Sequence, residues 1–163
     1  MHFHGYLWVG DKAVFDRESL RRPPSPVEPT VTSPPDVVER YREAVAQWKV
    51  AQVPPLETAY WLVKPSGMVR GTWGHPKEAA EWLGERLTEY VSRFASPGDR
   101  DTTRLARKVS YVAETLGWGG DISLGYYLER PLFLSLALVT CFPNRASPGQ
   151  ACPTGLDAWP DSG

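Results

Sequence analysis

The stretch "ISLGYYLERPLFLSLALVTCF", residues 122–142, decides the fold because it is the most apolar part of the chain. Its second half, 131–142, is rich in leucine and contains alanine, which favours a buried helix over a strand. Periodicity alone does not separate the two in so short an apolar run. The run of about a dozen residues is shorter than the roughly 18 needed to cross a bilayer. We therefore expect a buried core element here and no contact with a membrane.

Two other regions predict strands. The segment "FHGYLWV", residues 3–9, is aromatic and β-branched, and alternation places Phe3, Leu7 and Val9 on the face opposite His2, His4, Tyr6 and Trp8. Farther along, "TAYWLV" (58–63) and "MVRGTW" (68–73) are separated by "KPSG", which holds a proline and a glycine suited to a turn. The second pattern predicts a β-hairpin.

Helical periodicity accounts for three further stretches, at about residues 33–52, 76–94 and 101–116. Prolines crowd residues 21–35, which predicts an extended strap or linker, and residues 144–163 have the composition of a loop or tail. The order of these elements indicates an α+β fold in one domain spanning residues 1–163. In it, a small antiparallel sheet, the N-terminal strand plus a hairpin, packs against three or four helices.

Composition excludes several classes of function. The 18 Lys and Arg residues are balanced by 19 Asp and Glu, so the formal net charge of −1 offers no general attraction for nucleic acid. The two cysteines, Cys141 and Cys152, are too few for a disulfide framework and form no Cys-x-x-Cys motif, so we expect both to be reduced. The first residues lack the pattern of a signal peptide. We expect a cytoplasmic protein.

Two of the three histidines, His2 and His4, stand one residue apart in the first predicted strand and would point to the same face. A metal site built from histidines would need His75 beside them, together with further ligands. The alternative interpretation places His2 and His4 at the rim of an aromatic core. We favour this alternative, and accordingly expect no metal and no cofactor.

A catalytic set can be assembled from His4 or His75 as acid or base, with Asp121 beside the glycine-rich turn "GWGGD" as companion. Against it, Asp121 would serve equally well as a cap for the segment that follows. Such a pocket would make the protein a small enzyme or a small-ligand-binding protein.

The chain also holds seven tryptophans and seven tyrosines, more large rings than one small core hides completely. Those nearest turns, Trp73, Trp118, Tyr126 and Tyr127, are the candidates for an exposed binding surface. We therefore expect a small accessory protein that binds a protein or peptide partner through aromatic side chains. The enzyme or ligand-binding function is the alternative, and a small-molecule ligand and a homodimer remain open.

Overall fold

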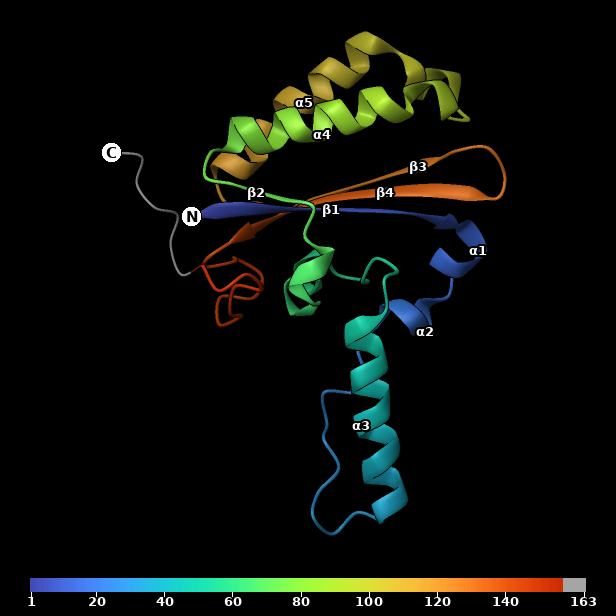
Figure 1. The fold of residues 1–163 in the computed structure, drawn as a ribbon, viewed down its shortest axis with the longest axis vertical. Helices are drawn as coiled ribbons and strands as arrows, with labels where there is room; N and C mark the ends of the chain where they lie inside the picture. Colours follow the sequence, from blue (N-terminus) through green and yellow to red (C-terminus); the bar gives the residue numbers. More distant parts are fainter. Residues whose placement is uncertain (157–163) are drawn as a thin grey trace.

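The computed structural model describes residues 1–156 and contains a four-stranded antiparallel sheet (Figure 1). Its strands are β1 (His2–Asp11), β2 (Gly71–Trp73), β3 (Ile122–Tyr127) and β4 (Leu132–Cys141), arranged in the order β2-β1-β4-β3. Two long helices lie on one face of the sheet, and shorter elements lie on the other. The predicted α+β class is confirmed.

The helix favoured for residues 131–142 is wrong, because this stretch forms the central strand β4. β4 pairs with β1 along its whole length, from His2 opposite Cys141 to Asp11 opposite Leu132, and with β3 on its other edge. Every residue from Phe133 to Cys141 is buried. A strand covered on both faces loses the alternation of polar and apolar residues, and its packing outweighs the helix propensity of leucine and alanine.

The hairpin predicted for residues 58–73 is also not formed. Thr58–Val63 is a 3-10 helix, a second short 3-10 helix spans Ser66–Met68, and only Gly71–Trp73 joins the sheet, as the edge strand β2 beside β1. The hairpin of this sheet is instead formed by β3 and β4, joined through residues 128–131. Residues 58–63 pack Trp61 and Leu62 beneath the sheet, which a strand on the sheet edge would not permit.

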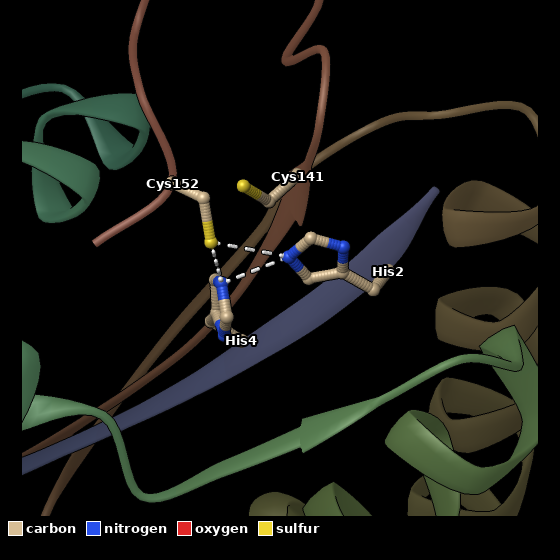
Figure 2. Close-up of side chains that lie close together, drawn as sticks. All are labelled: His2, His4, Cys141 and Cys152. Carbon is tan, nitrogen blue, oxygen red and sulfur yellow. Dashed lines mark hydrogen bonds between the residues drawn. The ribbon is translucent and has the colours of Figure 1, made fainter. Parts of the chain in front are cut away.

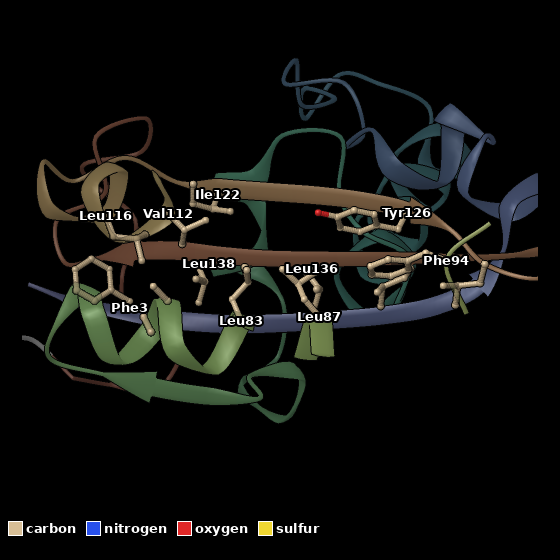
Figure 3. Packing of buried hydrophobic residues seen from close by; sticks show 14 residues of the cluster. Phe3, Leu83, Leu87, Phe94, Val112, Leu116, Ile122, Tyr126, Leu136 and Leu138 are labelled. Atoms are coloured by element: carbon tan, nitrogen blue, oxygen red, sulfur yellow. The ribbon is translucent and has the colours of Figure 1, made fainter. Parts of the chain in front are cut away.

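The larger hydrophobic core lies between the sheet and the helices α4 (Pro76–Tyr90) and α5 (Thr102–Gly117), as Figure 3 shows. Both helices were predicted from periodicity and are confirmed. Phe3, Leu7 and Val9 face this core, as the alternation in β1 predicts. Short 3-10 helices at Val91–Arg93 and Pro97–Arg100 connect α4 to α5.

The opposite face of the sheet carries a smaller core. Its six buried residues are Tyr6, Trp61, Leu62, Ala137, Val139 and Cys141. Within it, Tyr6 stacks on Trp61 with ring centroids 4.6 Å apart. The residues that follow β4, 142–156, fold back toward this face and are called the C-terminal segment here; Phe142 and Cys152 pack against the smaller core. Residues 157–163, the end of the predicted tail, lie outside the described part of the chain.

An arm extends away from the sheet on the side of the smaller core (Figure 1). Two short helices, α1 (Lys12–Phe15) and α2 (Glu18–Arg21), follow β1 and lead into the arm. The arm comprises residues 22–50, which form the proline-rich strap and helix α3 (Pro35–Val50). The strap is tied to α3 where the Tyr41 hydroxyl donates to the Ser25 carbonyl oxygen. Within residues 1–156, no helix is long and apolar enough to cross a membrane.

Candidate metal centre

Four side chains converge at one end of the sheet, on the side of the smaller core (Figure 2). They are His2 and His4 from β1, Cys141 from the last position of β4, and Cys152 from the C-terminal segment. The Nε2 atoms of the two histidines are 3.2 Å apart. The Sγ atom of Cys152 lies 3.4 Å from His2 Nε2 and 3.3 Å from His4 Nε2, and all four ligand atoms lie within 4.8 Å of one another.

The sheet explains three of the four positions. Residues two apart on a strand share a face, so His2 and His4 project together, and the antiparallel register sets Cys141 directly opposite His2. Cys152 arrives through the turn "CPTG", residues 152–155, in which Gly155 has a φ of 75° that favours glycine. The carboxylate of Asp121 supports the fold-back after β4 by accepting hydrogen bonds from the Thr140 N–H and the Asn144 side-chain amide.

The three spacings among His2, His4 and Cys152 match edges of a tetrahedron around zinc, and the Cys141 sulfur lies within 4.8 Å of these three ligand atoms. Bonds of about 2.0–2.1 Å to nitrogen and about 2.3 Å to sulfur place tetrahedral ligand atoms about 3.3 Å (N to N), about 3.6 Å (N to S) and about 3.8 Å (S to S) apart. The observed separations of 3.2, 3.3 and 3.4 Å lie within a few tenths of an ångström of these values. Small shifts of the side chains would therefore complete a Cys2His2 coordination shell.

Both histidines are held in the neutral form that binds metal. Burial lowers the pKa of His4 to about 4, with His2 adding to the effect, and burial together with the N-terminal amino group lowers the pKa of His2. The Nδ1 atom of His4 lies 2.8 Å from the Thr72 hydroxyl on β2. A proton on Nδ1 donated to Thr72 leaves the lone pair of Nε2 directed at the other three ligands, which is the orientation a metal requires.

The two thiols differ in their surroundings. Burial raises the pKa of Cys141 to about 12, and the neighbouring Cys152 thiol adds to the effect. Burial alone would also raise the pKa of Cys152, but hydrogen bonds from the Thr154 hydroxyl and the backbone N–H groups of Thr154 and Leu156 outweigh it and lower that pKa. Cys152 is thus prepared to be a thiolate, whereas a metal must displace the proton of Cys141.

Comparison with known proteins adds nothing to this geometry. No family model matches the chain, and no curated protein or solved structure is similar to it. The arrangement of the side chains is therefore the basis for assigning a function.

The three predicted catalytic residues occupy different surroundings. His4 is buried in the cluster, while His75 is exposed at the N-cap position of α4. Asp121 is half-buried, burial raises its pKa, and its carboxylate is engaged by Thr140 and Asn144. Within residues 1–156, no hydrogen bond joins His4, His75 and Asp121 to one another. Among the described residues, the structure does not bring these three side chains together.

The four predicted binding residues also divide between core and surface. Tyr126 is buried and stacks on Phe94, and the half-buried Trp73 packs against Trp82 with ring centroids 5.1 Å apart. Trp118 and Tyr127 are exposed by 58% and 57%. Trp118 precedes β3 and Tyr127 ends it, so these two rings lie at opposite ends of one strand. The four side chains do not gather into a single aromatic surface.

Sequence reasoning missed the two cysteines as ligands. Cys141 was placed in a predicted helix and Cys152 in a predicted tail, so neither had a reason to lie beside His2 and His4. The usable signal was the turn "CPTG", because a glycine two residues after a Cys-Pro pair allows backbone N–H groups to face the sulfur. Combined with a His-x-His strand, it points to a four-ligand site.

Proposed function

We propose that this protein binds one zinc ion through His2, His4, Cys141 and Cys152, and that the ion fastens the N-terminal strand, the end of β4 and the C-terminal segment together. The observation that supports the proposal most directly is the near-tetrahedral spacing of the His2, His4 and Cys152 ligand atoms, with the Cys141 sulfur within 4.8 Å of them. The sequence alone favoured rim histidines and no metal. The geometry favours a metal centre instead.

The ligand types select zinc and a structural role. Two thiolates and two imidazoles suit zinc better than the hard cations magnesium and calcium, which prefer oxygen ligands. A catalytic zinc keeps a position open for water or substrate, whereas four protein ligands close the shell. His2, His4 and Cys141 are almost completely buried, which also leaves little room for a substrate.

The test is the metal content of the reduced, full-length protein, read by native mass spectrometry and elemental analysis. We expect one zinc per chain, removed by a strong chelator and restored by added zinc. His4→Ala should abolish tight binding, and His75→Ala, which changes an exposed histidine outside the cluster, should leave it intact. A reduced wild-type chain that takes up no zinc on reloading contradicts the proposal.

A second candidate function is binding of a protein or peptide partner, favoured by the arm. Helix α3 contributes no buried residue, and the strap exposes Val27 by 78% and Val31 completely. Light scattering over a range of concentrations tests whether the partner is a second copy of this chain. A dimer that Val31→Asp dissociates supports this candidate, and a monomer at every concentration excludes a homodimer through the arm.

The proposed location is the cytoplasm. Thiolate ligands persist in a reducing compartment, where free cysteines are not driven into disulfides. Both cysteines are free in the structure. Cell fractionation tests this, since a cytoplasmic protein should be released only when the cell membrane is broken and should then remain in the supernatant.

A further inference from the structure

We propose that the centre is also a site of oxidation, at which hydrogen peroxide converts Cys141 and Cys152 to a disulfide and releases the zinc. This inference rests on the proposed function. The observation that supports it is the juxtaposition of the two sulfurs, which lie within 4.8 Å of each other, one at the end of β4 and the other in the C-terminal segment. Figure 2 shows both thiols on the same side of the two imidazoles.

The two cysteines have complementary places in such a reaction. Cys152 is partly exposed and is therefore the more accessible of the two to a small oxidant, whereas Cys141 is only 1% exposed. Peroxide therefore meets Cys152 first, and Cys141 is the nearest thiol that can resolve the product. A reactive, accessible cysteine beside a resolving cysteine is the usual arrangement of redox-sensitive sites.

The chemistry balances in two steps. The Cys152 thiolate attacks one peroxide oxygen, an S–O bond forms as the O–O bond breaks, and the departing hydroxide takes a proton to become water. The Cys141 thiolate then attacks the Cys152 sulfur, forming the S–S bond and expelling a second hydroxide, which is also protonated. Two thiolates supply two electrons to peroxide, and the zinc remains Zn²⁺ throughout. It loses two of its four ligands and dissociates.

The C-terminal segment can supply the movement that brings the sulfurs into bonding distance. Among the described residues, the hydrogen bonds of 148–156 are local or lead to the cluster itself, as in Gln150 N–H to Ser147 and Gly155 N–H to Cys152. Cys152 also packs against the smaller core, which contains Cys141, so a displacement toward Cys141 keeps Cys152 on that core. The disulfide would retain the segment on β4 but would no longer include His2 and His4, so β1 keeps its strand pairing and loses only its link through the metal.

The experiment treats the reduced, zinc-loaded full chain with a few equivalents of hydrogen peroxide. Free zinc is followed with a weak chromophoric chelator, and intact mass and non-reducing peptide maps identify the products. We expect one zinc released per chain, a mass about 2 Da below that of the reduced, zinc-free chain, and one peptide pair joined through Cys141 and Cys152. A dithiol reductant with added zinc should restore the starting state, and the oxidised form should melt at a lower temperature than the zinc form.

A matched variant, Cys152→Asp, replaces the exposed thiol with a carboxylate that also binds zinc. Peroxide should release no zinc from it; if this variant fails to hold zinc, the wild-type peptide map still decides. Zinc retained by the wild type after peroxide, or lost with a sulfinic acid in place of the disulfide, overturns the oxidation site and leaves the metal centre standing. A reduced chain that never binds zinc overturns the metal centre, and the oxidation proposal with it.

Discussion

The hydroxyl of Thr72 offers a sharp test of how the centre is organised. It lies 2.8 Å from His4 Nδ1, on the strand that pairs His4 with Thr72 across the sheet. Replacing Thr72 with valine keeps the shape and removes only the acceptor of the Nδ1 proton. His4 is then free to carry its proton on Nε2, where the proton blocks the position that a metal needs.

The size of the effect follows from this single hydrogen bond. Loss of a partner that orients a metal-binding histidine typically weakens metal affinity about 10- to 100-fold. That range corresponds to about 1.4–2.8 kcal/mol of binding free energy. In the zinc-free protein, a buried N–H left without its acceptor costs about 1–3 kcal/mol of unfolding free energy. We expect Thr72→Val to show both losses.

Zinc affinity is measured by competition with a chromophoric chelator at fixed pH, and stability by urea unfolding of the zinc-free chain. Thr72→Ser, which keeps the hydroxyl, should restore most of the affinity, and Thr103→Val on the exposed surface of α5 serves as the matched control. A Thr72→Val protein that binds zinc within twofold of the wild type would refute the role assigned to this hydrogen bond.

Three further predictions concern the body of the fold. Burial lowers the pKa of Lys64 from 10.5 to about 8, so above pH 8 the unfolded chain binds more protons at this residue than the native state. Between pH 8 and pH 10.5, the contribution of Lys64 to the unfolding free energy should therefore rise by about 3 kcal/mol. Urea unfolding at several pH values should show this rise in the wild type and not in Lys64→Met. The same pH dependence in both proteins would contradict the prediction. Leu83 is fully buried in the larger core. Leu83→Ala should therefore lower the unfolding free energy by about 2–5 kcal/mol in the same assay without changing zinc stoichiometry. A loss under about 1 kcal/mol would mean that the core tolerates the cavity. Asp121→Ala should remove the acceptor for Thr140 and Asn144 and lower the unfolding free energy by about 1–3 kcal/mol. It should also weaken zinc binding in the chelator assay, because the turn that positions Cys152 is less well fixed. Unchanged zinc affinity would show that this turn does not contribute to the metal centre.

Local patterns predicted the parts of the fold whose faces differ. In β1 the alternation of Phe3, Leu7 and Val9 with the histidines and Tyr6 identified both faces, because each packs against a different core. In α4 and α5 the helical period marks one apolar stripe, since the other side of each helix meets water. Where one side of a helix is solvated, polar residues fall on that side and apolar residues on the other, so the pattern predicts which side is buried.

The same patterns failed where both faces of an element are equally apolar or where tertiary contacts decide. β4 carries no alternation, so its leucines and alanine indicated a helix until pairing with β1 and β3 was known. Residues 58–63 have strand composition, yet the stacking of Trp61 on Tyr6 holds them beneath the sheet. The metal cluster depends on this same pairing, because only the β1–β4 register places Cys141 opposite His2.

The position of the cluster follows from the unequal covering of the sheet. One face is sealed by two amphipathic helices and a core of fourteen buried residues, whereas the other is covered by a core of six and by segments without long helices. Apolar burial contributes roughly 25 cal/mol per Å², so the thinner face offers little free energy to hold the C-terminal segment against it. Four ligands around one ion supply that attachment from few residues, in the way that metals stabilise domains whose cores are small. Loss of the ion should therefore loosen this end of the sheet first and leave the α4–α5 face intact, and hydrogen exchange of the zinc-free chain should show this as faster exchange in residues 2–6 than in α5.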